Sequence, residues 1–173
     1  MPKMGYAFGV GVSAVLSAMF EERHEFFSSA LHELARLPPG SRRDDCLEEL
    51  ARALGGHLRS VEQSMNAALR RVAAESQVDE VMHGYTAVSG SLARLLGDPA
   101  GGSRLSELRA AMDQMRIHEA FVVRTLTRGL GETALLMVEL QMEDRFDEYV
   151  GVIGIHGIMS GAVVLAESRR LAA

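Results

Sequence analysis

Three histidines and one tyrosine are the residues of this sequence whose types and spacing could do chemistry in a protein interior. His24, His57 and His118 each lie on a stripe of apolar residues that recur at intervals of three and four, and Tyr85 lies on a fourth stripe. Neutral imidazoles bind zinc, copper and ferrous iron, and three of them leave a coordination position open. The pattern therefore predicts a site for one metal ion, with Tyr85 or Glu62 as a fourth ligand or as a hydrogen-bond partner of a ligand.

The same histidines have a second interpretation that needs no metal. A polar side chain on an apolar stripe can be hydrogen-bonded to other buried polar groups or to water. His24, His57 and His118 would then bond to one another, to Tyr85 or to water, and would be ordinary members of the core. The sequence leaves both interpretations open.

Holding these residues in place requires helices, and almost the whole chain is predicted to be helical. The apolar spacing is that of helices, and segments rich in Pro and Gly at 37–41 and 97–103 indicate loops. A weaker break falls at 73–80, where Ser76 is predicted to cap the helix that follows. The predicted helices span residues 8–36, 44–73, 77–97 and 104–129, and a fifth begins near residue 132.

An internal repeat organises these helices. A shift of 61 residues superimposes Pro38 on Pro99 and His57 on His118 without a gap. Two similar helical hairpins follow each other, and each must bury its apolar face against the other. The predicted fold is all-α, an up-down four-helix bundle from two repeated hairpins (1–145), with an extra apolar, glycine-rich helical segment (146–173) that packs on the bundle, on the N-terminal segment or on another subunit.

The helix order and the histidine spacings resemble the hemerythrin-like, histidine–histidine–glutamate cation-binding domain. The segments that carry the resemblance are VSAVLSAMFEERHEFFSSALHEL, GGHLRSVEQSMNAAL and MDQMRIHEAFVVRTL, and it covers about residues 12–145. The resemblance implies a four-helix bundle around a non-haem di-iron centre. It also implies oxygen binding, sensing of oxygen, nitric oxide or iron, or protection against oxidative stress.

The sequence departs from the family pattern where that pattern has metal-bridging carboxylates. Those positions carry Val61 and Val122, and the position of the third-helix histidine carries Tyr85. A di-iron centre needs carboxylate oxygens to bridge and neutralise two cations. We therefore expect a degenerate member of the family, with one ion of iron, zinc or copper in place of an ordinary di-iron centre.

Two functions follow from these patterns. The first is a metal-binding or oxygen-, nitric oxide- or redox-sensing protein. The second is a metal-free helical scaffold that binds a protein partner through its apolar ends. An enzyme is less well supported, because no nucleophile–base pair and no paired carboxylates can be placed in the interior.

Charge, cysteine content and the uncharged segments indicate which classes of binding partner the chain could have. The chain of 173 residues has a formal net charge of −5 and no basic run, which argues against nucleic acid. Cys46 is the only cysteine, so no internal disulfide forms, and a lone thiol suits the cytoplasm. The uncharged segments 5–20 and 149–166 carry stripes of small residues, which predict close helix contacts and a homo-oligomer. Membrane association of 149–166 is not favoured, because four glycines and the central His156 weaken it as a membrane span.

Overall fold

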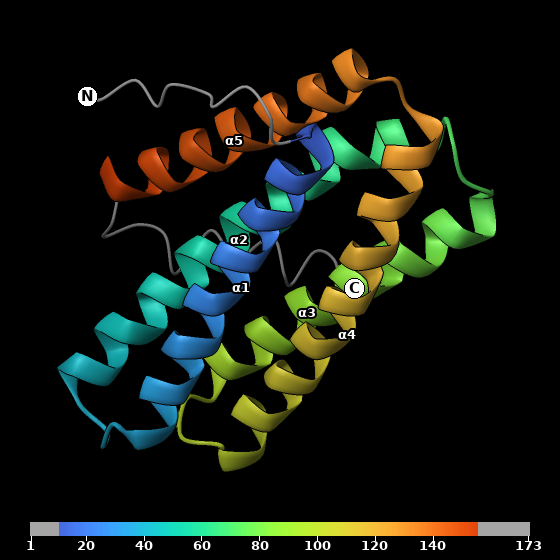
Figure 1. The fold of residues 1–173 in the computed structure, drawn as a ribbon. Coiled ribbons are helices and arrows are strands. Elements are labelled where there is room, and N and C mark those ends of the chain that lie inside the picture. The colour runs from blue at the N-terminus through green and yellow to red at the C-terminus, as the bar shows by residue number, and fades with distance from the viewer. Residues whose placement is uncertain (1–10, 156–173) are drawn as a thin grey trace.

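The computed structural model describes residues 11–155, which form five helices and contain no strand (Figure 1). This confirms the predicted all-α class. Most helices begin or end within four residues of the predicted boundaries. The helices are α1 (Val12–Arg36), α2 (Ser41–Leu69), α3 (Glu75–Gly97), α4 (Gly102–Gly129) and α5 (Glu132–Ile155).

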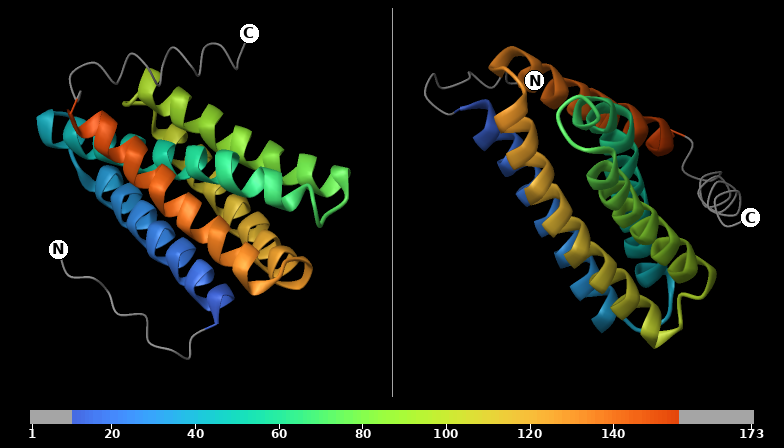
Figure 2. Two further views of the ribbon diagram at one scale, coloured as in Figure 1. Left: turned by 90° about the horizontal axis from the view of Figure 1, so that it is seen from above. Right: turned by 90° about the vertical axis from the view of Figure 1, so that its right-hand side faces the viewer.

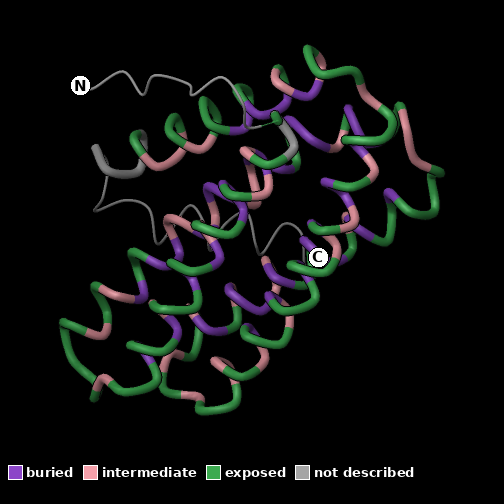
Figure 3. The backbone as a smooth tube through the Cα atoms, in the orientation of Figure 1, coloured by how far each residue is buried: buried purple, intermediate pink, exposed green. Residues whose placement is uncertain are grey.

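The first four helices form a bundle from two antiparallel hairpins. One hairpin is α1 with α2 and the other is α3 with α4, while α1 also packs on α4 and α2 on α3 (Figure 2). Each helix thus has two neighbours within the bundle, and its buried residues, purple in Figure 3, recur along its length. The apolar residues among them form one core. The bundle axis is the place where side chains from all four helices can meet.

Helix α3 shows the pattern most regularly. Its buried apolar side chains are spaced alternately by three and four residues, which keeps one face toward the core. They are Val78, Val81, Tyr85, Val88, Leu92 and Leu95, each at most 7 % exposed.

One arginine ties the two hairpins together at the end of the bundle that carries their loops. The guanidinium of Arg43, at the start of α2, donates hydrogen bonds to the main-chain oxygens of Leu34 and Leu37. It also donates to the main-chain oxygen of Pro99 in the α3–α4 loop, at 2.9 Å. The two loops are therefore held by a single side chain.

Helix α3 begins differently from the sequence prediction. The residue preceding its first turn is Ala74, and the Ala74 N–H donates to the side-chain oxygen of Gln77 at 3.2 Å. Ser76 lies inside the first turn, so the prediction that Ser76 caps this helix is wrong. The side chain of Gln77 reaches back to the main-chain N–H of Ala74, as the third residue of a capping box does, and this contact sets the start of the helix at residue 75.

Helix α5 lies along the face formed by α1 and α2 (Figure 2). Its approach to α2 is close at Gly56, where an added Cβ would lie 3.1 Å from side-chain atoms of both Tyr149 and Val150. Since α5 is continuous from Glu132 to Ile155, the predicted division at residue 145 falls inside a helix.

The apolar ends are only partly covered by this structure. Residues 1–10 and 156–173, which hold much of the two small-residue stripes, lie outside the described residues, so the predicted self-association stays a prediction. Among residues 11–155, no helix is both long enough and apolar enough to cross a bilayer.

Candidate metal centre

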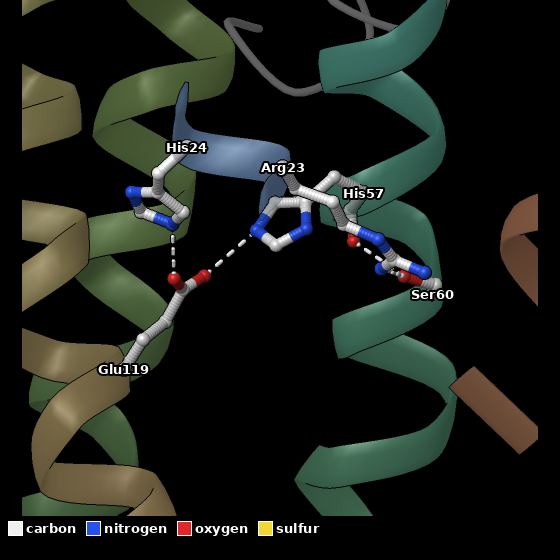
Figure 4. Close-up of polar contacts among 5 residues, drawn as sticks. All are labelled: Arg23, His24, His57, Ser60 and Glu119. Carbon is white, nitrogen blue, oxygen red and sulfur yellow. Dashed lines mark hydrogen bonds and ion pairs between the residues drawn. The ribbon is translucent and has the colours of Figure 1, made fainter. Parts of the chain in front are cut away.

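Two histidines and one glutamate converge near the bundle axis (Figure 4). His24 extends from α1, His57 from α2 and Glu119 from α4, and they are 4 %, 0 % and 2 % exposed. The Nε2 atom of His24 lies 2.5 Å from Oε2 of Glu119, and Nε2 of His57 lies 2.7 Å from Oε1. One ligand atom from each of the three residues lies within 4.8 Å of the others, so a single cation could contact all three.

Aromatic side chains hold the two imidazoles in place. Phe20 and Phe27, one turn before and one turn after His24 on α1, pack edge-on against the ring of His57 at centroid distances of 5.7 and 5.4 Å. The rings of His24 and His57 are themselves nearly perpendicular, at 89° and 5.8 Å. These contacts fix both Nε2 atoms toward Glu119 and surround the group with apolar atoms.

Glu119 is ionised in this setting. Burial by itself would raise the pKa of Glu119, but the charges of and hydrogen bonds from His57 and His24 outweigh it and lower the pKa to about 2. Burial lowers the pKa of His57, although the carboxylate of Glu119 acts in the opposite direction. The group therefore combines an anionic oxygen donor with an imidazole whose neutral form is favoured by burial, and metal ligands require these protonation states.

Tyr85 brings the fourth helix to the group. This α3 side chain is 7 % exposed, and its buried hydroxyl has no hydrogen-bond partner among the described residues. Burial, and then the charge of Glu119 close by, raise the pKa of Tyr85 well above its ordinary value, so the phenol is neutral. A buried hydroxyl without a partner costs free energy, and an ion or a water molecule beside Glu119 would remove that cost.

Arg23 stands behind the group, on the side of α5. Its guanidinium donates to the hydroxyl of Ser60 at 3.3 Å, and Ser60 donates to the main-chain oxygen of His57 at 2.8 Å. The guanidinium also stacks over the ring of Phe146, 4.0 Å from its centroid. Burial lowers the pKa of Arg23, while Glu119 and other acidic side chains raise it, and the arginine places a positive charge near the carboxylate.

The spacing of the three side chains fits one metal ion after a small expansion. Ligand bonds of about 2.1 Å place two ligand atoms about 3.0 Å apart at octahedral angles and about 3.4 Å apart at tetrahedral angles. The two nitrogen–oxygen distances of 2.5 and 2.7 Å would each have to grow by less than about 1 Å.

The structure does not bring His118 into this group. His118 is half-buried and packs against α3, where an added Cβ at Gly84 would lie 2.8 Å from its Cδ2 atom. One residue along a helix turns the side chain by about 100°, so Glu119 faces the axis where His118 was expected. Glu62 is exposed on α2 and also lies outside the group. Tyr85 lies near enough to Glu119 for the charge of the carboxylate to raise its pKa.

Glu119 was missed because the repeat aligned His118 with His57. A second signal in the sequence favours Glu119. The buried spacing of α4, alternately four and three, passes from Met115 to Val122 through residue 119. Glu119 is the one charged residue on that stripe between Leu108 and Leu126, and this contrast could have identified it as a candidate.

Three further residues discussed in the sequence analysis, Val61, Val122 and Cys46, lie in buried or half-buried surroundings. Val61 and Val122, which the resemblance placed at the positions of bridging carboxylates, are each 1 % exposed. Cys46 is half-buried and its Sγ lies 3.8 Å from the main-chain oxygen of Ala30. Burial raises the pKa of this thiol, which favours its unreactive form.

Comparison with models of known families, with curated proteins and with solved structures finds no match to this chain. The assignment of function therefore depends on the site itself.

Proposed function

We propose that this chain is a hemerythrin-like helical bundle that binds one transition-metal ion through His24, His57 and Glu119. In this proposal it acts as a metal-binding or oxygen-, nitric oxide- or redox-sensing protein. The observation that carries the proposal is the convergence of two imidazoles and one carboxylate, all at most 4 % exposed, from three different helices. Buried charged groups are rare unless they are paired or bind a metal.

The donor set favours a particular class of ion. Two imidazoles and one carboxylate with open positions are typical of non-haem ferrous sites, and two histidines with a glutamate also bind catalytic zinc. Glu119 supplies one negative charge, which offsets half the charge of a divalent ion, whereas two ions would leave a large uncompensated charge in a dry interior. A single ferrous or zinc ion fits best. An open coordination position on iron would allow a diatomic gas to bind.

A metal-free scaffold is the second candidate, and one observation favours it. Glu119 already satisfies Nε2 of both histidines, while Nδ1 of His24 and Nδ1 of His57 have no partner among the described residues. Metal-bound histidines usually donate this second ring N–H to a carboxylate or a carbonyl, which fixes the ring. In the scaffold interpretation Glu119 joins the two Nε2 atoms, and the three residues form a hydrogen-bonded group within the core.

Metal content per chain distinguishes the two candidates. The full chain, purified without a chelator or a histidine tag, is analysed by mass spectrometry and then titrated with ferrous and zinc ions. We expect about one ion per chain. Glu119→Gln keeps the shape of the side chain and removes its charge, and metal affinity should fall by well over tenfold. The matched control is His118→Ala, the neighbouring residue that lies outside the group, which should keep its metal.

Three results would count against this proposal. No metal in any preparation, together with no binding in titration, would support the scaffold. Two irons per chain would mean that a dinuclear centre forms after all. Loss of metal in the His118→Ala variant with retention in Glu119→Gln would return the site to the ligand set that the repeat predicted.

A further inference from the structure

A pocket of about 290 Å³ opens between α1 and α4 and reaches the buried group. At its floor lie His24 and Glu119. The two helices that form its walls run side by side in Figure 2. The polarity of its lining changes from the floor to the mouth, and this change indicates which class of ligand the pocket could bind.

The inner walls are apolar and the outer rim is cationic. Phe20 on α1 and Val123 on α4 are 5 % and 9 % exposed and form the inner part of the pocket. Arg116 and Arg124 on α4 are exposed at its mouth. The small side chain of Ala120 lies between the two arginines and leaves the pocket open to solvent.

We infer that this pocket binds a short-chain carboxylate, with the carboxylate group held by Arg116 and Arg124 and the alkyl chain packed against Phe20 and Val123. The two arginines form no ion pair with any residue in the range 11–155, so their donors are available. Guanidinium groups present paired N–H donors whose geometry matches a carboxylate.

The positions of the charged groups set the orientation of the ligand. Glu119 lies at the inner end, so a carboxylate pointing inward would approach another carboxyl group. A carboxylate pointing outward meets two guanidinium groups. Because pockets for drug-sized ligands begin at about 300 Å³, a cavity of this size suits a chain of only a few carbons.

One acidic side chain at the mouth should weaken carboxylate binding, so its removal should increase the affinity. Glu21 on α1 is exposed at the mouth, opposite the arginines. It lowers the net positive charge of the rim from two to one, and its repulsion weakens carboxylate binding. Glu21→Gln should therefore bind the carboxylate more tightly than the unmodified chain does.

This inference goes beyond the proposed metal site and does not require it, since the arginines and the apolar walls are present with or without an ion. The experiment titrates butyrate into the full chain by calorimetry, with butyramide as the neutral molecule of the same shape. Both the metal-loaded and the chelator-treated protein are used, and metal content is measured in parallel. A loss of metal without a loss of butyrate binding then separates the two proposals.

We expect butyrate to bind saturably and butyramide not to bind. Arg116→Gln/Arg124→Gln should weaken butyrate binding about tenfold, as expected for two partly solvated charge contacts, without changing metal content. The matched control, Arg71→Gln/Arg109→Gln, removes the same charge elsewhere on the surface and should leave affinity unchanged. The inference is wrong if butyrate does not bind, if butyramide binds equally well, if the two double variants behave alike, or if Glu21→Gln weakens binding.

Discussion

Replacing Glu119 by leucine in the metal-free chain should destabilise the bundle far more than a single core substitution of similar size. The change removes the acceptor for Nε2 of both His24 and His57, and both rings are almost fully buried. Each imidazole is then left with a ring N–H or a lone pair that water cannot reach. A buried polar group without a partner costs its full desolvation free energy.

The size of the effect follows from the pKa of Glu119. The shift from 4.5 to about 2 corresponds to about 3 kcal/mol of preferential stabilisation of the ionised carboxylate in the folded chain. Removing one partner of a buried charged group typically costs about 3–5 kcal/mol. We therefore expect Glu119→Leu to lower the free energy of unfolding by about 3–5 kcal/mol at neutral pH.

A triple variant separates this explanation from a simple loss of packing. His24→Leu/His57→Leu/Glu119→Leu removes every member of the polar group, and apolar replacement of a buried charged set is neutral or stabilising by about 1–4 kcal/mol. The chain that carries three changes should therefore be more stable than the chain that carries one. The exposed Glu62→Leu serves as the single-site control and should stay within about 0.5 kcal/mol of the unmodified protein.

The assay is urea unfolding followed by circular dichroism, after treatment with a chelator. The reasoning is refuted if Glu119→Leu unfolds at the same urea concentration as Glu62→Leu. It is also refuted if the triple variant is less stable than Glu119→Leu, because the imidazoles would then contribute stability without their carboxylate. A change of slope in the denaturation curve would indicate that the compactness of a state had changed.

Two further predictions concern stability. The folded pKa of His57 is below 6.5, and the folded pKa of Glu119 is about 2 against 4.5 in the unfolded chain. The unfolded chain therefore binds more protons between these values. The free energy of unfolding should fall as the pH is lowered from about 6.5 toward 2. Urea midpoints measured across this pH range test the prediction. In His57→Leu the midpoint should depend less on pH above pH 4.5. A midpoint that rises on acidification would contradict the lowered pKa values of His57 and Glu119. Arg43→Ala should cost about 1–2 kcal/mol, because a charged donor shared by three main-chain carbonyls is lost. The neighbouring Arg42→Ala, which removes an exposed ion pair with Glu33, should cost under about 0.5 kcal/mol, and equal losses would show that the Arg43 contacts contribute nothing.

The fold could be predicted because its determinants are local. Apolar residues at helical spacing, two loops rich in Pro and Gly and the weaker break at 73–80 are enough to place four helices, and the 61-residue repeat pairs them as hairpins. Helix ends were less predictable, since they depend on individual side chains such as Gln77, which reaches back over the first turn of α3. The position of α5 on α1 and α2 depends on contacts between residues distant in sequence, and no local pattern specifies them.

The candidate site was only partly predictable, for a geometric reason. His24 and His57 are polar residues on strongly apolar stripes, and that contrast identifies them without a structure. The choice between His118 and Glu119 depends on a helix rotation of about 100°, which a repeat alignment cannot fix. The repeat preserves the order of residues along α2 and α4, whereas the angle of each helix about its own axis is set by its neighbours.

The closeness of Gly56 to His57 has a mechanical consequence. One face of this turn of α2 receives Tyr149 and Val150 of α5, while the adjacent residue directs its imidazole toward the bundle axis. A larger side chain at position 56 would have to displace Tyr149 and Val150 or shift α2, and a shift of α2 would carry the ring of His57 with it. The packing of α2 on α5 therefore constrains where His57 lies, although α5 supplies none of the three residues of the candidate metal centre.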